Sequence, residues 1–318
     1  MNNATPQENL YDLIIIGAGP AGYTAGIYAT RYRIKNLVIG KSLGGLITDA
    51  HKICNFPTRR EIGGSELAKQ MKEHLEEEGG TVIQDRVEKI EKNNSFFKIK
   101  TSQGTDYQTK TVLIATGTKR RKLGLPREED FLGKGVSYCA TCDAMFFRNK
   151  RVAVVGGSDA AHTASLVLAD VAKKVFQIYR RDQLRGTTAW VEQVKNNPKI
   201  EVIYNTNVTG LQGKNRLEKI NLDKPYQEKN NLEVAGLFIE IGSEPETTLD
   251  QSLNLAKDSS DYIKINSNQS TNINGIYAAG DITTGSNKFR QAITACGEGA
   301  VAANSIYKYL KTSKDRSK

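Results

Sequence analysis

The sequence predicts an α/β protein built from two copies of one strand–turn–helix–strand arrangement. In the first copy a glycine-rich segment, Gly17–Gly22, follows a short β-branched run at Asp12–Ile16 and precedes a helix-length stretch. In the second copy Gly156–Ala161 has the same surroundings. A G-x-G-x-x-G turn between a strand and a helix is typical of Rossmann-like dinucleotide-binding domains, because glycine permits the tight turn and a close backbone approach to a pyrophosphate. Two copies therefore suggest two dinucleotides with electron transfer between them.

The elements of the first copy follow in a regular order. A helix at Tyr23–Arg33 follows the glycine turn, and a second strand follows at Asn36–Ile39. A later apolar strand, Val112–Thr116, ends on Gly117. Their short length and β-branched composition predict these strands. Meander-like segments lie between the paired elements, at Arg86–Lys92, Phe96–Thr101 and Thr105–Tyr107.

The second copy repeats this order. Strand Val152–Val155 leads through the glycine turn into a helix that extends to about Ala172, and strand Lys174–Tyr179 follows. An apolar strand at Leu237–Ile241 then ends on Gly242. The recurrence of the closing strand and its glycine supports two copies of one architecture.

The residues about 20 positions beyond each glycine turn distinguish the two dinucleotides, because a carboxylate there binds the ribose 2′-OH of NAD. The first copy has Gly40 and Lys41 at this place and no carboxylate, so NAD is not indicated. The second copy has Arg180 and Arg181, with Arg185 nearby. Guanidinium groups form bidentate, charge-assisted hydrogen bonds with phosphate, which favours NADP(H). An exposed basic loop without a ligand is the alternative.

The segment Cys139–Asp143, with the sequence CATCD, contains the residues of the chain that most directly indicate catalytic chemistry. Two residues between the cysteines let one helical turn bring both sulfur atoms within disulfide distance. A helix beginning there would stabilise a thiolate, and Asp143 could transfer a proton during thiol–disulfide exchange. Half of a zinc site and inert packing are the alternatives, but the remaining cysteines and histidines form no second closely spaced pair. We therefore favour a redox dithiol and expect no metal.

Composition places the chain among ordinary globular proteins and argues against several function classes. Its 318 residues suffice for about two domains without disulfide support. Most of the net charge of +10 comes from Lys119–Lys122 and the C-terminal segment, which favours solvated charge over a nucleic-acid surface. No apolar run approaches the ~20 residues of a membrane-spanning helix, and the polar N-terminus shows no secretory signal. With four cysteines and no disulfide framework, we expect a cytoplasmic protein.

Seven motifs occur in a characteristic order: GAGPAG (Gly17–Gly22), GG (Gly44–Gly45), ATG (Ala115–Gly117), CATCD (Cys139–Asp143), RRDQLR (Arg180–Arg185), AAGD (Ala278–Asp281) and RQA (Arg290–Ala292). In this order and spacing they resemble the low-molecular-weight thioredoxin reductases over nearly the whole chain. The resemblance implies two Rossmann-like, three-layer ββα domains. An FAD domain would comprise residues 1–117 and 246–318, with an NADPH domain at 118–245 inserted between them. Hinges would lie near Gly117–Thr118 and Glu244–Pro245.

The resemblance, together with the patterns above, assigns residues to both cofactors. The FAD residues would be Gly17, Gly19, Pro20, Ala21, Gly22, Gly40, Gly44, Gly45, Leu46, Asn55, Val87, Ala115, Thr116, Gly117, Gly280, Asp281, Arg290, Gln291 and Ala292. The NADPH residues would be Gly157, Ser158, Asp159, Ala160, Arg180, Arg181, Arg185 and Gly242.

The resemblance also implies a reaction. Electrons would pass from NADPH through FAD to the disulfide of Cys139 and Cys142, and then to a thioredoxin-like protein. Cys142 would face the flavin, Cys139 would attack the partner's disulfide, and Asp143 would donate a proton. Such enzymes are homodimers whose NADPH domain rotates. The residues that would dock the partner are Lys134, Met145 and Phe146.

The chain departs from the family pattern chiefly around the second glycine turn. Ser158 stands at the second fingerprint glycine, where its hydroxyl could bind phosphate or its Cβ could hold the dinucleotide away. Tyr179 replaces the histidine of an H-R-R motif, and His162–Ala164 lacks the family's acidic residues. Leu46 replaces a glutamine near the flavin. A dithiol oxidase or a reductase with another electron donor is therefore an alternative, and a non-catalytic nucleotide-binding regulator is another.

Overall fold

The computed structural model describes residues 10–50, 53–93, 96–247, 249 and 253–315. It divides into two compact units: unit 1 is Met1–Lys119 with Glu244–Lys318, and unit 2 is Arg120–Ser243. Two short strands, β7 (Thr118–Arg120) and β16 (Ser243–Pro245), pair with each other where the chain passes between the units. Within the described ranges no helix is long and apolar enough to cross a bilayer.

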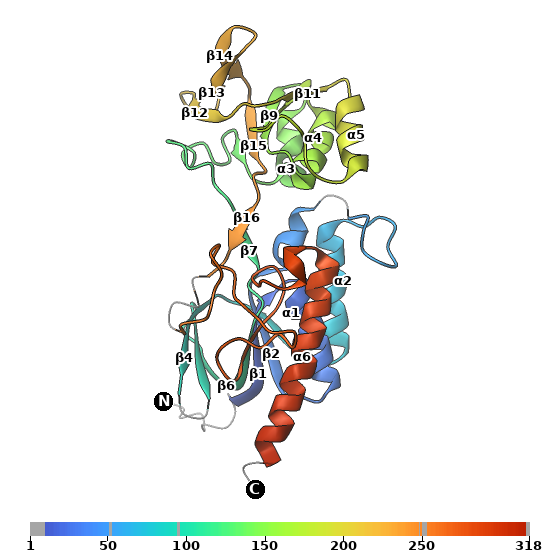
Figure 1. Cartoon of the computed structure of the whole chain (residues 1–318), viewed down its shortest axis with the longest axis vertical. Helices are drawn as coiled ribbons and strands as arrows, with labels where there is room; N and C mark the ends of the chain where they lie inside the picture. Colours follow the sequence, from blue (N-terminus) through green and yellow to red (C-terminus); the bar gives the residue numbers. More distant parts are fainter. Residues whose placement is uncertain (1–9, 51–52, 94–95, 248, 250–252, 316–318) are drawn as a thin grey trace. The chain divides into compact units, whose positions relative to one another are not determined.

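Unit 1 is built on a sheet whose strands lie in the order β3-β2-β1-β6-β5-β4, and β17 also pairs with β6. The strands β3, β2, β1, β6 and β17 pair in parallel, whereas β4 and β5 extend the sheet with antiparallel pairing. Helices α1, α2 and α6 lie together on one side of this sheet (Figure 1). The elements are β1 (Leu10–Ala18), α1 (Pro20–Arg31), β2 (Asn36–Leu43), η1 (Gly45–Asp49), α2 (Gly64–Glu77), β3 (Val82–Gln84), β4 (Val87–Lys92), β5 (Phe97–Thr101), β6 (Asp106–Ile114), β17 (Ile276–Ala278), η3 (Ser286–Lys288) and α6 (Ala292–Asp315).

The core of unit 1 has two parts, one on each face of the parallel strands. Leu13 and Ile15 of β1 pack against the helices, while Ile14 and Ile16 face the other way. On that second face they pack with residues of β4 and β5, such as Ile99. A strand buried on both faces reads as a continuous apolar run, which is why Asp12–Ile16 is apolar after its first residue.

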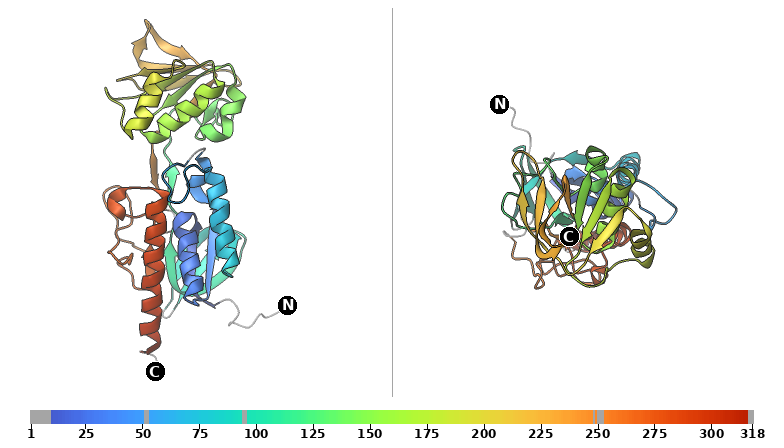
Figure 2. Two further views of the ribbon diagram at one scale, coloured as in Figure 1. Left: turned by 90° about the vertical axis from the view of Figure 1, so that its right-hand side faces the viewer. Right: turned by 90° about the horizontal axis from the view of Figure 1, so that it is seen from above.

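Unit 2 repeats this layered plan. Its sheet has the order β11-β10-β9-β15-β8 and is parallel throughout, with α4 and α5 side by side on one face (Figure 2). A separate antiparallel sheet, β12-β13-β14, packs on the other face. The elements are β8 (Val136–Ser137), α3 (Ala140–Asp143), η2 (Ala144–Phe147), β9 (Arg151–Val155), α4 (Asp159–Val171), β10 (Lys174–Ile178), α5 (Thr188–Asn196), β11 (Ile200–Ile203), β12 (Val208–Gln212), β13 (Lys219–Tyr226), β14 (Lys229–Glu233) and β15 (Gly236–Ile239). The predicted α/β fold with Rossmann-like units is confirmed.

The structure corrects several predicted boundaries. The segments Thr105–Tyr107 and Val112–Thr116 lie largely within one strand, β6, because β6 pairs in parallel with β1 over most of its length. This strand ends before Ala115. Helix α1 begins at Pro20, earlier than predicted, since a proline in the first helical turn lacks only an N–H that would have had no partner. Strand β15 ends at Ile239, short of the predicted end.

Candidate active site

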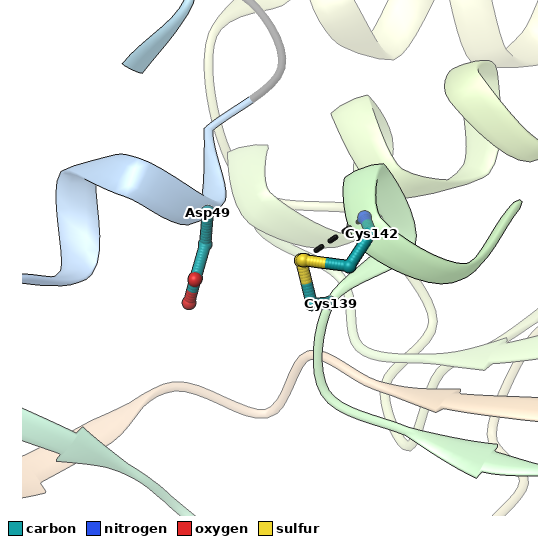
Figure 3. Close-up of side chains that lie close together, drawn as sticks. All are labelled: Asp49, Cys139 and Cys142. Carbon is teal, nitrogen blue, oxygen red and sulfur yellow. Dashed lines mark hydrogen bonds between the residues drawn. A yellow bond between two sulfur atoms is a disulfide. The ribbon is translucent and has the colours of Figure 1, made fainter. Parts of the chain in front are cut away.

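The cysteine pair lies in unit 2, directly after β8. Cys139 precedes the single helical turn of α3, and a disulfide joins it to Cys142 with the two Cα atoms 5.4 Å apart. The N–H of Cys142 donates a hydrogen bond to Sγ of Cys139 at 3.2 Å (Figure 3). The predicted disulfide distance is thus confirmed. Cys142 is exposed and Cys139 half-buried, so the disulfide is accessible from solvent.

Asp143 follows the pair at the end of α3. Its backbone N–H donates to the carbonyl of Cys139 at 3.2 Å, which closes the turn. Its half-buried carboxylate accepts no hydrogen bond from the described residues. A carboxyl group beside a dithiol, with no other partner, is available for proton transfer during thiol–disulfide exchange.

Three exposed side chains lie near the cysteine pair in the sequence of unit 2. Met145 and Phe146 are part of η2 and are 59% and 73% exposed. Lys134 is exposed in the turn before β8. Large apolar side chains that remain in water without a packing partner are typical of a surface that contacts another protein.

The first glycine turn is compact and leaves no room for side chains at two positions. A Cβ on Gly22 would lie 1.8 Å from the carbonyl oxygen of Gly17, and a Cβ on Gly17 would lie 2.1 Å from the carbonyl oxygen of Ala115. Gly17 also has a φ of +118°, which favours glycine. Gly19 lies beside Gly45, since a Cβ on Gly45 would be 3.5 Å from the Cα of Gly19. The turn thus brings the GAGPAG, GG and ATG motifs together.

A second part of unit 1 approaches from the C-terminal segment. Gly280 has a φ of +80°, and its N–H donates to the buried Glu298 carboxylate at 2.8 Å. Glu298 also accepts hydrogen bonds from the hydroxyls of Thr283 and Ser286, at 3.1 and 2.7 Å. These contacts hold the turn that carries Asp281. Sequence reasoning missed Glu298, because a single acidic residue in a helix carries no signal that it is buried.

Asp281 and Arg290 form the charged part of this region. Burial raises the pKa of Asp281 to about 6; the Arg290 guanidinium opposes the rise and the Glu298 carboxylate adds to it. The Arg290 guanidinium stacks 4.0 Å above the ring of Tyr262. Its Nε and Nη2 atoms are buried and have no hydrogen-bond partner among the described residues. Buried donors of this kind require an acceptor, which an anionic or oxygen-rich ligand would supply.

The remaining residues predicted for FAD also lie in unit 1. Asn55 donates from Nδ2 to Oε1 of Gln291 at 2.8 Å, although the two are 236 positions apart. Thr116 donates from its hydroxyl to the carbonyl of Glu246 at 3.2 Å, and Val87 is buried at the start of β4. The others are Pro20 and Ala21 at the start of α1, Gly40 in β2, Gly44 before η1, the exposed Leu46 in η1, Gly117 with a φ of +68°, and Ala292 at the start of α6.

The second glycine turn lies between β9 and α4. A Cβ on Gly156 would lie 2.2 Å from the carbonyl oxygen of Glu240, and one on Gly157 would lie 2.4 Å from the ring of Tyr179. The Tyr179 ring is buried against this turn, and its hydroxyl has no partner in the described part of the chain. Ser158 precedes α4 and makes no side-chain capping bond.

The predicted phosphate-binding arginines lie in the segment that follows β10 and returns to this turn. Arg180, Arg181 and Arg185 are exposed, and within the described ranges no carboxylate pairs with their guanidinium groups. The backbone N–H of Arg185 donates to the carbonyl of Gly157 at 2.7 Å, so this arginine is adjacent to the glycine turn. Asp159 and Ala160 begin α4, and Gly242 follows β15 with a φ of +101°.

Comparisons with known proteins agree with this geometry. The family described as pyridine nucleotide-disulphide oxidoreductase matches residues 11–299. A thioredoxin reductase of Treponema pallidum is 41% identical over 308 residues, which are 96% of this chain and 99% of that protein. The chain belongs to the thioredoxin reductase family. The predicted resemblance is thereby confirmed.

Solved structures of thioredoxin reductases also match nearly the whole chain. The thioredoxin reductase of Lactococcus lactis is 34% identical with a TM-score of 0.90, over 95% of this chain and 99% of that one. A ferredoxin-flavin thioredoxin reductase of Clostridium acetobutylicum is 33% identical with a TM-score of 0.52, also over 95% and 99%. The name of the second of these proteins includes ferredoxin.

Proposed function

We propose that this chain is an NADPH-dependent thioredoxin reductase. Electrons pass from NADPH through FAD to the Cys139–Cys142 disulfide, and from the reduced pair to the disulfide of a thioredoxin-like protein. The observation that carries the proposal is the accessible Cys139–Cys142 disulfide beside a carboxylate, in a chain that also has two glycine turns of dinucleotide-binding type.

Unit 1 is the proposed FAD domain. Its residues fit FAD in two respects: the first glycine turn leaves backbone free of side chains, and Arg290 presents buried donors without an acceptor. When bound, FAD takes up two electrons from a nicotinamide and passes them on to a disulfide. Asp281 and Arg290 would orient it, and Glu298 would hold the turn on which Asp281 lies.

The dithiol performs the exchange with the protein substrate. After reduction, the Cys139 thiol gives its proton to the Asp143 carboxylate, and the Cys139 thiolate attacks one sulfur of the substrate disulfide. The other substrate sulfur leaves as a thiolate and takes that proton from Asp143. The Cys142 thiol then gives its proton to the Asp143 carboxylate, and its thiolate attacks Cys139 in the mixed disulfide, while the second substrate sulfur leaves and takes this proton from Asp143. This step releases the second substrate thiol and restores the Cys139–Cys142 disulfide. The exchange consumes two thiols and produces two thiols, so its electrons and protons balance.

The substrate surface is proposed to include Met145, Phe146 and Lys134. Two exposed apolar side chains next to the cysteine pair suit the apolar region that surrounds a substrate disulfide, and the lysine adds a charge for orientation. The family resemblance supports a homodimer in the cytoplasm as part of the same proposal, and the elution volume in size-exclusion chromatography tests the dimer.

Unit 2 is the proposed NADPH domain. Arg180, Arg181 and Arg185 have no acidic partner among the described residues, and Arg185 is adjacent to the second glycine turn, which favours a dinucleotide with a 2′-phosphate. A reductase with a different electron donor is the second candidate. It is favoured by Ser158 at the position of a fingerprint glycine and by the Tyr179 ring packed against Gly157. The similarity to a ferredoxin-flavin thioredoxin reductase is consistent with this candidate.

A coupled assay tests the proposed reaction. Purified FAD-loaded protein is mixed with NADPH and oxidised thioredoxin, and NADPH oxidation is followed by absorbance. We expect turnover that requires thioredoxin and is lost in Cys139→Ser and Cys142→Ser. The control is Cys54→Ser, which removes an exposed free thiol outside the pair. Equal turnover in all three variants would show that the Cys139–Cys142 pair does not carry the electrons.

A further inference from the structure

A network of buried polar side chains lies beneath the second glycine turn. His162 on α4 is fully buried, and its Nε2 lies 2.7 Å from the carbonyl oxygen of Arg185. Its Nδ1 lies 3.0 Å from Nε2 of Gln177, which also donates to the carbonyl of Gly156 at 3.1 Å. The hydroxyl of Ser165 donates to Oε1 of Gln177 at 3.2 Å. The network therefore connects the glycine turn to the segment that carries the arginines.

The partners determine the direction of each hydrogen bond. The carbonyl of Gly156 can only accept, so the amide nitrogen of Gln177 is the atom that faces Gly156 and His162, and Oε1 of Gln177 accepts from Ser165. Because that nitrogen is a donor, Nδ1 of His162 accepts. The proton of the neutral imidazole is then on Nε2, which donates to the Arg185 carbonyl. Both ring nitrogens of His162 therefore form hydrogen bonds, Nδ1 as an acceptor and Nε2 as a donor.

A second contact holds the same segment. The Asp159 carboxylate accepts hydrogen bonds from the backbone N–H and the hydroxyl of Thr187, at 2.7 and 2.9 Å. The N–H of Arg185 donates to the carbonyl of Gly157. The backbone of Arg185 is thus held on both sides, at its N–H by the glycine turn and at its carbonyl by His162. Its guanidinium remains exposed and without an acidic partner among the described residues.

We propose that His162 is a positioning residue for recognition of the 2′-phosphate of a dinucleotide, acting through Arg185; this rests on the proposed NADPH-dependent function. His162, with Asp159 as a second support, holds the backbone of the arginine segment at a set distance from the glycine turn. The pyrophosphate and the 2′-phosphate are then bound by two sites whose separation is fixed before the dinucleotide arrives. A charged hydrogen bond contributes less to the free energy of binding when its donor must first be ordered, so a segment held in place in advance favours binding.

The test measures binding of two adenine nucleotides to the FAD-loaded protein by calorimetry. The probes are 2′,5′-ADP, which has the 2′-phosphate, and 5′-AMP, which lacks it. Two variants of His162 separate its hydrogen bonds. In His162→Asn the short side chain can still accept from Gln177 but does not reach the Arg185 carbonyl. In His162→Gln the longer amide can still donate to that carbonyl.

We expect the wild type to bind 2′,5′-ADP more tightly than 5′-AMP. His162→Asn should reduce this preference about tenfold with little change in 5′-AMP affinity, and His162→Gln should stay within about twofold of the wild type. A purely structural role would instead lower thermal stability in both variants without changing the preference. A preference in His162→Asn equal to that of the wild type would overturn the inference.

Two further outcomes keep this inference apart from the proposed function. If the wild type itself shows no preference for 2′,5′-ADP, the NADPH-dependent function fails and the role of His162 fails with it. If His162→Asn does not fold, the exposed Thr187→Val variant replaces it, since it removes only the hydroxyl that binds Asp159. This variant should reduce the preference two- to fivefold, roughly the value of one hydrogen bond; an unchanged preference would contradict the proposed support of the segment.

Discussion

Asp281 gives this protein a pH dependence whose direction follows from the structure. Burial raises the pKa of its carboxyl from 3.8 to about 6 in the folded, FAD-free protein. Between these values the folded protein retains a proton that the unfolded chain has lost. Raising the pH through this window therefore lowers the free energy of unfolding, and the loss is nearly complete about one pH unit above the folded pKa. At 1.36 kcal/mol per pKa unit, the full cost is about 3 kcal/mol.

Asp281→Asn removes the ionisation and should remove this cost. In urea unfolding of FAD-free protein followed by circular dichroism, the variant should gain stability over the wild type as the pH rises. Between pH 5 and pH 7.5 its advantage should grow by about 1.4 kcal/mol, because part of the cost is already present at pH 5. The same variant should bind FAD more weakly, since the carboxylate is part of the proposed site.

Asp258→Asn is a matched control in the same unit. A hydrogen bond from Lys288 lowers the pKa of Asp258 to about 2. Its stabilising contribution is therefore complete above 3.8 and is lost only as the pH falls toward 2. The effect of this substitution should be the same at pH 5 and pH 7.5. An advantage of Asp281→Asn that is constant or shrinks over that interval would refute the reasoning.

Three further predictions concern the proposed sites. Gly22→Ala places a Cβ 1.8 Å from a carbonyl oxygen and should yield protein without bound flavin. The control is the exposed Gly297→Ala, whose Cβ meets nothing within 4 Å and which should retain the flavin. The ratio of absorbance at 450 and 280 nm measures the flavin content of both variants. Arg185→Gln should lower the ratio of kcat/KM for NADPH to kcat/KM for NADH roughly 10- to 100-fold, because it removes a charged hydrogen bond to the 2′-phosphate. If this ratio is unchanged, Arg185 does not bind the phosphate. Replacing both Met145 and Phe146 by Ala should raise the KM for thioredoxin roughly tenfold, with little effect on the KM for a small aromatic disulfide. An equal rise in KM for both substrates would contradict docking of thioredoxin on these side chains.

Sequence patterns were sufficient for the features that depend on local chemistry. The β9–turn–α4–β10 order followed from a short apolar run, a glycine turn and a helix-length stretch, and the disulfide distance of Cys139 and Cys142 followed from their spacing. Boundaries were less accurate where pairing decides them, as in β6, which continues because β1 and β5 both pair with it.

Contacts that join distant segments could not be read from the sequence. Nothing in the sequence relates Arg290 to the ring of Tyr262, or Glu298 to the N–H of Gly280, because each pair meets only after the sheet and α6 have formed. His162 is a similar case. Its position on a helix after a glycine turn favours a structural role, and only its two hydrogen bonds, to Gln177 and Arg185, indicate more.

The electron donor is the part of the account that one measurement tests most directly. FAD-loaded protein is mixed rapidly with NADPH or NADH under strict anaerobiosis, and the visible absorbance of the flavin is followed. We expect NADPH to bleach the flavin at least about tenfold faster than NADH, because the arginines near the second glycine turn have no acidic partner among the described residues and favour a 2′-phosphate. A flavin that neither nucleotide bleaches, but that dithionite does, would contradict the account and favour a different electron donor.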